Sequence, residues 1–165
     1  MATKLRVIIG ADDAGQEYKN ALKVMLEKDP QVELVIDISL REKETDFYPA
    51  IAVAAGQRIA VGEADRALLI CGTGLGMAIA ANKVAGIRAV TAHDGYSVER
   101  SVLSNNAQVL CMGQRVIGLE LAKHLVKIWL SLSFDKESSS SVKVNQITDY
   151  ENGRLLLDTD APQCD

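Results

Sequence analysis

The chain has 165 residues, of which 48% are hydrophobic and 24% charged, and its formal net charge is -4. This composition fits one folded domain and excludes a strongly basic nucleic-acid-binding protein. Because no apolar run approaches roughly 20 residues, we expect no membrane span, and we recognise no targeting segment before Leu5. The three cysteines are widely spaced and lack a CxxC pattern, which argues against a disulfide framework or a zinc site and favours the reducing cytoplasm.

Short apolar runs alternate along the chain with longer segments of helical period. Strands are predicted at residues 5–9, 32–36, 66–70, 87–91 and 108–112, and helices at 15–28, 50–61, 76–82, 97–103, 119–130 and 142–151. In the helix 119–130 the residues expected to face inward are Leu121, Leu125, Ile128 and Trp129. Strand-helix alternation with continuously apolar strands predicts a Rossmann-like, three-layer α/β sandwich with a five-stranded parallel sheet.

The last part of the chain differs in character from the rest. We predict an α/β domain over residues 1–134, followed at 135–165 by a polar link and a tail of the same domain. Residues 135–141 include four consecutive serines and read as a mobile link, and residues 158–165 are expected to fray. The tail helix carries Val142, Val144, Ile147 and Tyr150, so we expect it to be exchanged onto a partner subunit, with Lys143 near the neighbour's site.

Parallel α/β sheets place their ligand sites at the carboxyl ends of the strands. The unusual residues of this chain follow its predicted strands. They are Asp12 and Asp13, the segment Cys71 to Gly76, His93 and Asp94, and the segment Gly113 to Arg115. We therefore expect a functional site at this edge of the sheet.

The segment Cys71-Gly72-Thr73-Gly74-Leu75-Gly76 allows three interpretations. Cys71 could be a buried core residue beside a tight turn. The glycines could bind a dinucleotide, although Met77 breaks the GxGxxG pattern and the loop follows the third strand. Cys71 could also be a catalytic base at a helix N-terminus, where backbone amides hold an anion and favour a thiolate.

The block from Cys71 to Lys83, followed by Gly86-Ile87-Arg88-Ala89, resembles the signature of the ribose 5-phosphate isomerase B family, which includes the galactose 6-phosphate isomerase subunits. The resemblance continues through His93-Asp94, Asn105 and the segment Met112 to Gly118, and it covers residues 5–134. It implies aldose-ketose isomerisation of a small phosphorylated sugar through an enediol. It also implies a homodimer with shared active sites and no metal or organic cofactor, and it leaves open whether dimers pair into tetramers.

The resemblance also implies roles for individual residues. The catalytic residues would be Cys71 as the base, Thr73 as a proton relay and His93 as a group that opens a sugar ring or orients the substrate. The substrate-binding residues would be Asp12, Asp13, Tyr48, Gly72, Gly74, Gly76, Asn105, Arg115 and Lys143. For His93 the alternative is an imidazole satisfied by its neighbouring carboxylate, and His124 is given no role.

The sequence departs from the family at three places. Asp13 stands where the family's first loop has a phosphate-binding histidine, Ser104 replaces a ring-opening histidine, and no arginine remains near Ser138 to Ser141. The main expectation is a ribose 5-phosphate type of isomerase. The alternative is a tetrose 4-phosphate isomerase, because a four-carbon sugar phosphorylated at its terminus cannot cyclise and needs no ring opener.

Functions of other classes remain open at this point. The same fold could serve as a non-catalytic sugar-phosphate sensor, a nucleotide-binding oxidoreductase or one subunit of a hetero-oligomeric isomerase. Retention of both Cys71 and Thr73 argues against the sensor, and the incomplete glycine pattern argues against the oxidoreductase.

Overall fold

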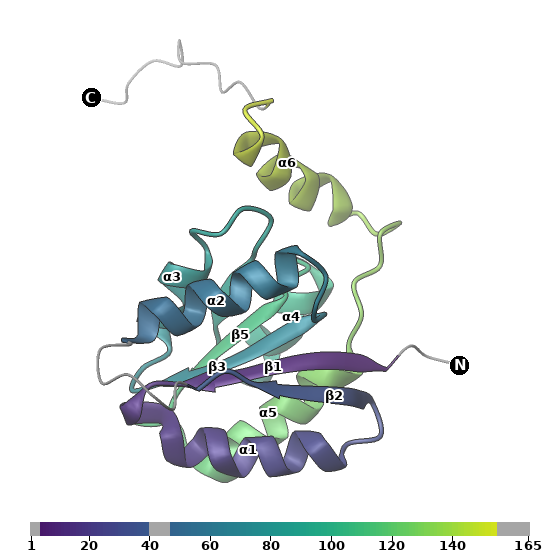
Figure 1. Cartoon of the computed structure of the whole chain (residues 1–165). Coiled ribbons are helices and arrows are strands. Elements are labelled where there is room, and N and C mark those ends of the chain that lie inside the picture. The colour runs from purple at the N-terminus through teal and green to yellow at the C-terminus, as the bar shows by residue number, and fades with distance from the viewer. Residues whose placement is uncertain (1–3, 40–46, 155–165) are drawn as a thin grey trace, which may run out of the picture.

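The computed structural model describes residues 4–39 and 47–154. Within this part of the chain, five parallel strands form one sheet in the order β2-β1-β3-β5-β4 (Figure 1). The strands are β1 (Leu5–Ala11), β2 (Val32–Asp37), β3 (Arg66–Cys71), β4 (Ala89–Thr91) and β5 (Val109–Gly113). The helices are η1 (Asp13–Gly15), α1 (Gln16–Lys28), α2 (Tyr48–Ala60), α3 (Leu75–Ala81), α4 (Gly95–Leu103), α5 (Leu119–Ser131) and α6 (Ser141–Glu151). The predicted three-layer sandwich is confirmed.

The sheet separates two hydrophobic cores, because successive strand residues point to opposite faces. One core packs α1, α4 and α5 against the sheet, with Leu22, Leu125 and Trp129 fully buried or nearly so. The other packs α2 and α3 against the opposite face and includes Met77 and Cys71. Figure 1 shows these two helical layers on either side of the strands. The catalytic candidate Cys71 thus belongs to the α2–α3 side.

The strand order reverses between β1 and β3, since β2 lies on one side of this pair and β5 and β4 on the other. Such a reversal opens a crevice at the carboxyl ends of the strands, where α/β proteins bind their ligands. All six residues of β3 are buried, so Cys71 ends a strand in the middle of the sheet. The fold therefore presents Cys71 at the crevice.

One detail of the predicted helix faces is wrong. Leu121 was expected to face inward but is 44% exposed, whereas Ala122 is fully buried. The buried stripe of α5 runs through Ala122, Leu125, Val126 and Trp129, which is the i, i+3, i+4, i+7 spacing of a helix. Starting that stripe one residue later turns Leu121 toward the solvent.

The helix α6 lies beyond the α2–α3 layer of its own chain (Figure 1). Val144 is its buried residue, and Gly86 donates its amide to Glu151 Oε2 at 2.8 Å. The apolar residues Val142, Ile147 and Tyr150 are exposed by 65%, 51% and 65%. The exchange of this helix onto a partner stays a prediction, and the fraying expected at 158–165 lies outside the described residues.

None of the helices in the described ranges has the length and apolar character needed to cross a membrane.

Candidate active site

A pocket of about 330 Å³ lies at the carboxyl ends of β1 and β3. Its lining residues come from the loops after these strands, the start of α2 and the turn after β5. They are Asp12, Ala14, Tyr48, Cys71, Gly72, Thr73, Gly76 and Arg115. Every member except Ala14 was a predicted site residue, so the pocket gathers most of the predicted site.

Cys71 is 5% exposed at the end of β3, and its sulfur accepts a hydrogen bond from the Gly74 amide at 3.0 Å. The bond requires the chain to turn back on itself within three residues. Gly74 makes this turn with φ at 81°, a left-handed conformation that strains other residues. An amide aimed at the sulfur stabilises negative charge there, as a catalytic base needs.

The start of α3 supplies further amides beside the sulfur. The first-turn amides of a helix have no intrahelical acceptor, and Gly76 lines the pocket, so its amide can bind a ligand oxygen. The Leu75 amide faces Thr73 Oγ1 at 3.4 Å. A β-carbon built on Gly76 would lie 2.5 Å from Tyr48 Cε2, so glycine at this position lets the tyrosine ring rest against the loop.

Opposite charges face each other across the pocket. Arg115 lies over Gly72, with its Nη1 atom 3.6 Å from the position of a β-carbon on that glycine. Asp12 caps η1 by accepting the Ala14 amide at 3.1 Å. Burial raises the pKa of Asp12, the Asp13 carboxylate raises it further, and the amides of the loop and Arg115 offset only part of this. The pocket can therefore hold an anionic group at Arg115 and a hydroxyl at Asp12.

His93 follows β4 and does not line the pocket. Its Nε2 atom accepts the Gly113 amide at 2.8 Å. Burial lowers the pKa of His93, although Asp94 opposes the change, and the acceptor role likewise requires an unprotonated Nε2 atom. Asp94 instead caps α4 by accepting the Ser97 amide at 2.8 Å.

Besides His93 and Gly74, three further predicted residues are absent from the pocket lining. Asp13 is exposed at the start of η1. Asn105 is exposed after α4 and donates its Nδ2 group to the Arg100 carbonyl at 3.1 Å. Lys143 is exposed on α6. The roles predicted for these residues stay predictions.

Two contributors were missing from the sequence-based prediction. Ala14 lines the pocket next to Asp12, and Thr91 Oγ1 donates to the Gly74 carbonyl at 3.0 Å. The signal for Thr91 was a hydroxyl closing an otherwise apolar strand. The signal for Ala14 was its place in the first loop, although an alanine carries no group that suggests chemistry.

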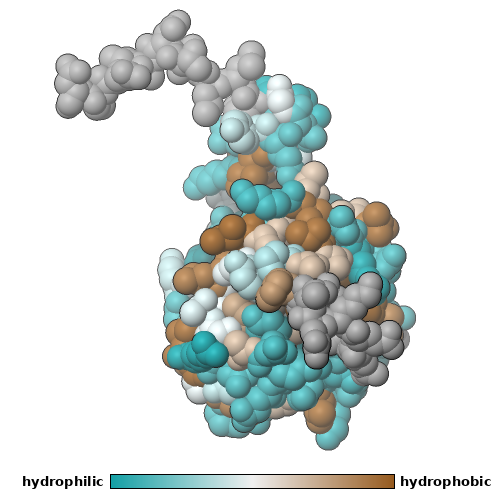
Figure 2. Space-filling model, turned by 60° about the vertical axis from the view of Figure 1, so that its left-hand side comes forward, coloured by the Kyte–Doolittle hydropathy of each residue, from teal (hydrophilic) through white to brown (hydrophobic). Residues whose placement is uncertain are grey.

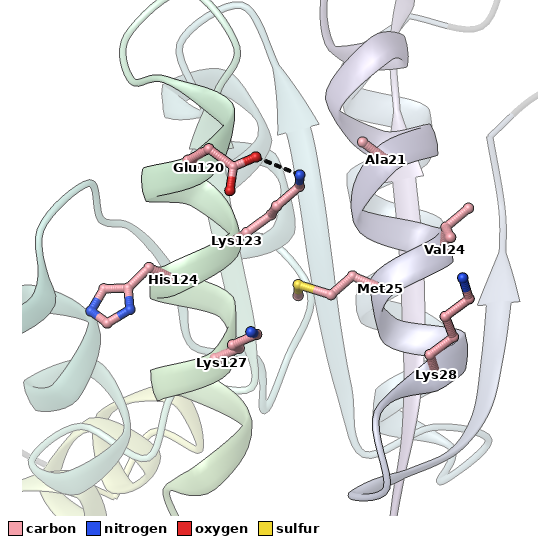
Figure 3. A pocket seen from close by; sticks show the side chains of 8 residues that line it. All are labelled: Ala21, Val24, Met25, Lys28, Glu120, Lys123, His124 and Lys127. Atoms are coloured by element: carbon pink, nitrogen blue, oxygen red, sulfur yellow. Dashed lines mark hydrogen bonds and ion pairs between the residues drawn. The ribbon is translucent and has the colours of Figure 1, made fainter.

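A second pocket of about 420 Å³ lies between α1 and α5. Figure 3 shows Met25 reaching from α1 toward α5 and Lys123 paired with Glu120, whose atoms are 2.6 Å apart. Neither Cys71 nor any other predicted site residue lines this pocket. The chemistry-bearing residues thus gather at the smaller pocket.

A thiol, a hydroxyl, a carboxylate and free amides around one small pocket define an α/β enzyme equipped to move protons on a small hydroxylated anion. A comparison with protein families identifies the group to which it belongs. The family model described as Ribose/Galactose Isomerase matches residues 7–147. The chain belongs to this ribose/galactose isomerase family, which confirms both the resemblance seen in the sequence and the isomerase class.

Individual relatives cover nearly the whole chain. D-erythrulose-4-phosphate isomerase 2 of Mycolicibacterium smegmatis is 64% identical over 148 residues, which are 89% of this chain and 97% of that protein. D-erythrulose-4-phosphate isomerase of Pectobacterium atrosepticum is 43% identical over 90% of this chain and 96% of that protein. The structure of type B ribose 5-phosphate isomerase of Leishmania infantum has a TM-score of 0.86 and 31% identity, and it covers 93% of this chain and 100% of that one.

Proposed function

We propose that the chain interconverts the aldose and ketose forms of a tetrose 4-phosphate, D-erythrose 4-phosphate and D-erythrulose 4-phosphate. The observation that supports a four-carbon substrate is that neither histidine of the chain is available to open a sugar ring. The sequence holds two histidines: His124 is exposed on α5, away from the pocket, and the Nε2 atom of His93 accepts the hydrogen bond of the Gly113 amide. A four-carbon sugar phosphorylated at its terminus stays open and needs no ring opener, and kinship to two D-erythrulose-4-phosphate isomerases supports the same choice.

The proposed mechanism begins with proton abstraction beside the carbonyl by Cys71. The carbon-hydrogen bond breaks, the sulfur takes the proton, and the carbonyl oxygen becomes an enediolate. Free amides of the loop, including that of Gly76, hold the enediolate oxygen. Thr73 passes a proton between the two neighbouring oxygens, and the sulfur returns its proton to the adjacent carbon. The Gly74 amide supports the sulfur throughout.

The two ends of the substrate have separate partners in this proposal. Arg115 binds the phosphate, since it supplies the positive charge of the pocket lining. Asp12 accepts a hydrogen bond from a sugar hydroxyl, and Tyr48 closes one wall of the pocket. This arrangement needs neither a metal nor an organic cofactor for the proton transfer.

A ribose 5-phosphate isomerase is the second candidate. Its specific support is the likeness of the whole fold to a solved type B ribose 5-phosphate isomerase. Pentose phosphates cyclise, so this function would require some group of the site to open the ring. The substrate assay below separates the two candidates.

We further propose that the active protein is a homodimer with shared sites. Exposed apolar side chains occur on both α3 and α6: Leu75 is 58% and Ile79 is 64% exposed, beside those of α6 described above. Figure 2 shows hydrophobic surface gathered on the body near the base of the projecting helix. Burying it against a second copy would bring Lys143 and Asn105 toward the neighbour's pocket, and residues 135–165 would act as a dimer-contacting tail. A catalytic thiol and an odd cysteine count fit action in the cytoplasm.

The test is the initial rate on D-erythrose 4-phosphate, ribose 5-phosphate and allose 6-phosphate for the unmodified protein, Cys71→Ala and Cys164→Ser. We expect the highest kcat/KM on the tetrose phosphate, abolished by Cys71→Ala and retained by Cys164→Ser. A preference for ribose 5-phosphate would overturn the proposed substrate length. Full activity of Cys71→Ala would overturn the proposed base.

A further inference from the structure

Thr91 and His93, at the end of the edge strand β4, do not line the pocket but form hydrogen bonds with Gly74 and Gly113, which lie beside it. We propose that Thr91 and His93 are positioning residues, each holding one half of the active site in place. Thr91 holds the loop that carries Cys71, and His93 holds the turn from Gly113 to Arg115. The inference rests on the proposed isomerase function at this site but does not depend on the length of the sugar.

Thr91 acts through Gly74. Its Oγ1 atom donates to the Gly74 carbonyl at 3.0 Å, while the Gly74 amide donates to Cys71 Sγ at 3.0 Å. The same carbonyl also accepts the Ala78 amide at 3.2 Å, which begins the hydrogen bonding of α3. Glycine has no side chain to fix its own orientation, so the threonine supplies the restraint from outside. Thr91 thereby restrains Gly74, the residue whose amide supports the sulfur.

His93 acts through Gly113, the buried last residue of β5. The neighbouring strand β4 ends at Thr91, so the imidazole accepts the Gly113 amide in place of a strand carbonyl. A β-carbon built on Gly113 would lie 2.6 Å from the Thr73 Cα atom, so the two backbones are in close contact. A displacement of Gly113 would therefore also displace Thr73.

The turn after Gly113 carries Arg115, so the hydrogen bond of His93 to Gly113 also helps to fix the position of Arg115 in the pocket. The Gln114 amide donates to the Cys71 carbonyl at 2.9 Å, and the Arg115 amide donates to the Gly72 carbonyl at 3.1 Å. These bonds tie the end of β5 to the end of β3, side by side in the sheet. His93 thus stabilises the position of Arg115 relative to Cys71.

The acceptor role and a proton-transfer role predict different responses to substitution. A glutamine at position 93 can present an amide oxygen where Nε2 lies, but it cannot exchange a proton at neutral pH. An alanine can do neither. The pair His93→Gln and His93→Ala therefore separates a positioning residue from an acid or base.

The first experiment measures kcat and KM for His93→Gln, His93→Ala and the control His124→Ala on the sugar phosphate that the unmodified protein isomerises. We expect His93→Ala to lose about 10- to 100-fold in kcat/KM, because small misplacement of catalytic groups is costly. His93→Gln should stay within about threefold of the unmodified protein. Circular dichroism confirms folding. If a folded His93→Gln is as inactive as His93→Ala, or if both are fully active, the proposal is overturned. If His93→Ala does not fold, His93→Gln still decides.

The second experiment compares Thr91→Val, which removes the hydroxyl at nearly constant shape, with Thr91→Ser, which keeps it. We expect Thr91→Val to lower kcat about 10-fold with KM within about twofold, since the sulfur's support is disturbed and the phosphate site is not. The rate at which iodoacetamide alkylates Cys71 should also differ between Thr91→Val and the unmodified protein. Thr91→Ser should have the kcat and the alkylation rate of the unmodified protein. Equal impairment of the two variants, or normal activity of Thr91→Val, would overturn the role of the hydroxyl. The substrate assay with the unmodified protein fails or succeeds independently of both experiments.

Discussion

At the scale of single residues, the site works through backbone groups as much as through side chains. Cys71 is the proposed base, but its sulfur is held by an amide of Gly74, and the ring of Tyr48 rests where Gly76 has no side chain. Arg115 is different, because it supplies charge rather than shape. Substitutions at these positions should therefore fail in different ways.

Arg115→Ala should raise KM for the phosphorylated substrate by about 10- to 150-fold, because a charge-assisted contact of about 1.5–3 kcal/mol is lost. The proton transfer itself involves other groups, so kcat should fall much less. Arg115→Lys should recover part of the affinity, since lysine binds as a point charge without the planar fork. Steady-state kinetics measures both effects. Arg58→Ala, which removes an exposed charge from α2, is the matched control and should leave KM unchanged. An unchanged KM in Arg115→Ala would contradict the phosphate assignment.

Gly76→Ala tests the close approach of Tyr48 to the loop. Its new methyl group would lie 2.5 Å from Tyr48 Cε2, so the ring or the loop must move. We expect kcat/KM to fall by about 10- to 100-fold, with a smaller effect on thermal stability, because the ring can swing outward. Gly118→Ala, whose added carbon meets nothing within 4 Å, should behave like the unmodified protein in the same assay. Equal activities of the two variants would show that the contact is not needed.

At the scale of elements, hydrophobic pattern predicted the existence and order of strands and helices, because apolar runs and helical periods are properties of the chain itself. Element ends depend on side chains that bond the backbone. The strand expected to start at Ile87 begins at Ala89, since the Arg88 amide is taken by Gln108 Oε1 at 2.9 Å and Asn82 binds both backbone groups of Ala89. The spacing of hydrophobic residues in the sequence does not reveal hydrogen bonds between side chains and the backbone.

A buried ion pair joins α1 to β2. Lys19 Nζ lies 3.0 Å from Asp37 Oδ2, and the two side chains are 5% and 11% exposed. Burial raises the pKa of Asp37, but the hydrogen bonds from Lys19 and Ser39 outweigh burial and leave the pKa below its ordinary value. A lowered folded-state pKa contributes stability above about pH 4, which is lost as the pH falls through the folded-state pKa.

Asp37→Ala should destabilise the protein by about 3–5 kcal/mol, because it leaves the ammonium of Lys19 buried without a partner. The free energy of unfolding, measured in urea at pH 7, tests this value. The unmodified protein should lose stability as the pH falls below about 4 and through the lowered pKa of Asp37, and this acid loss should shrink in Asp37→Ala. A variant as stable as the unmodified protein, or one with the same acid profile, would contradict the assigned role of the pair.

At the scale of the whole molecule, the pocket of one chain holds only part of the predicted site. Cys71, Thr73, Asp12 and Arg115 were predictable because they follow strands of one sheet, and a parallel sheet brings strand ends together. The places of Asn105, which follows α4, and of Lys143, on α6, relative to the substrate were not predictable, because both side chains are exposed and neither lines the pocket of its own chain. A hydrophobic pattern does not show where exposed side chains lie relative to a bound ligand.

Shared sites predict complementation between inactive chains. In a mixture of Cys71→Ala and Lys143→Ala, a mixed dimer contains one site with both residues intact, so activity should rise to about one quarter of the unmodified protein. The rate is measured after co-refolding and compared with the sum of the separate variants. A rate no higher than that sum would show that each chain completes its own site.

The exposed apolar residues of α6 allow a test of the proposed dimer. Ile147→Asp places a charge among the exposed apolar residues of α6, so the variant should be monomeric by light scattering at micromolar concentration, while the unmodified protein is dimeric. Lys136→Ala, in the link before α6, is the control and should remain dimeric. A monomeric unmodified protein would contradict the proposed dimer.

The sheet that separates the two cores also separates the effects that substitutions in each core should have. Cys71 and the buried part of α3 belong to the α2–α3 core, whereas Trp129 and the buried faces of α1 and α5 lie behind the strands. Substitutions in the core around Trp129 should therefore act mainly on the stability of the chain, whereas substitutions in the core that contains Cys71 should also change the position of the thiol.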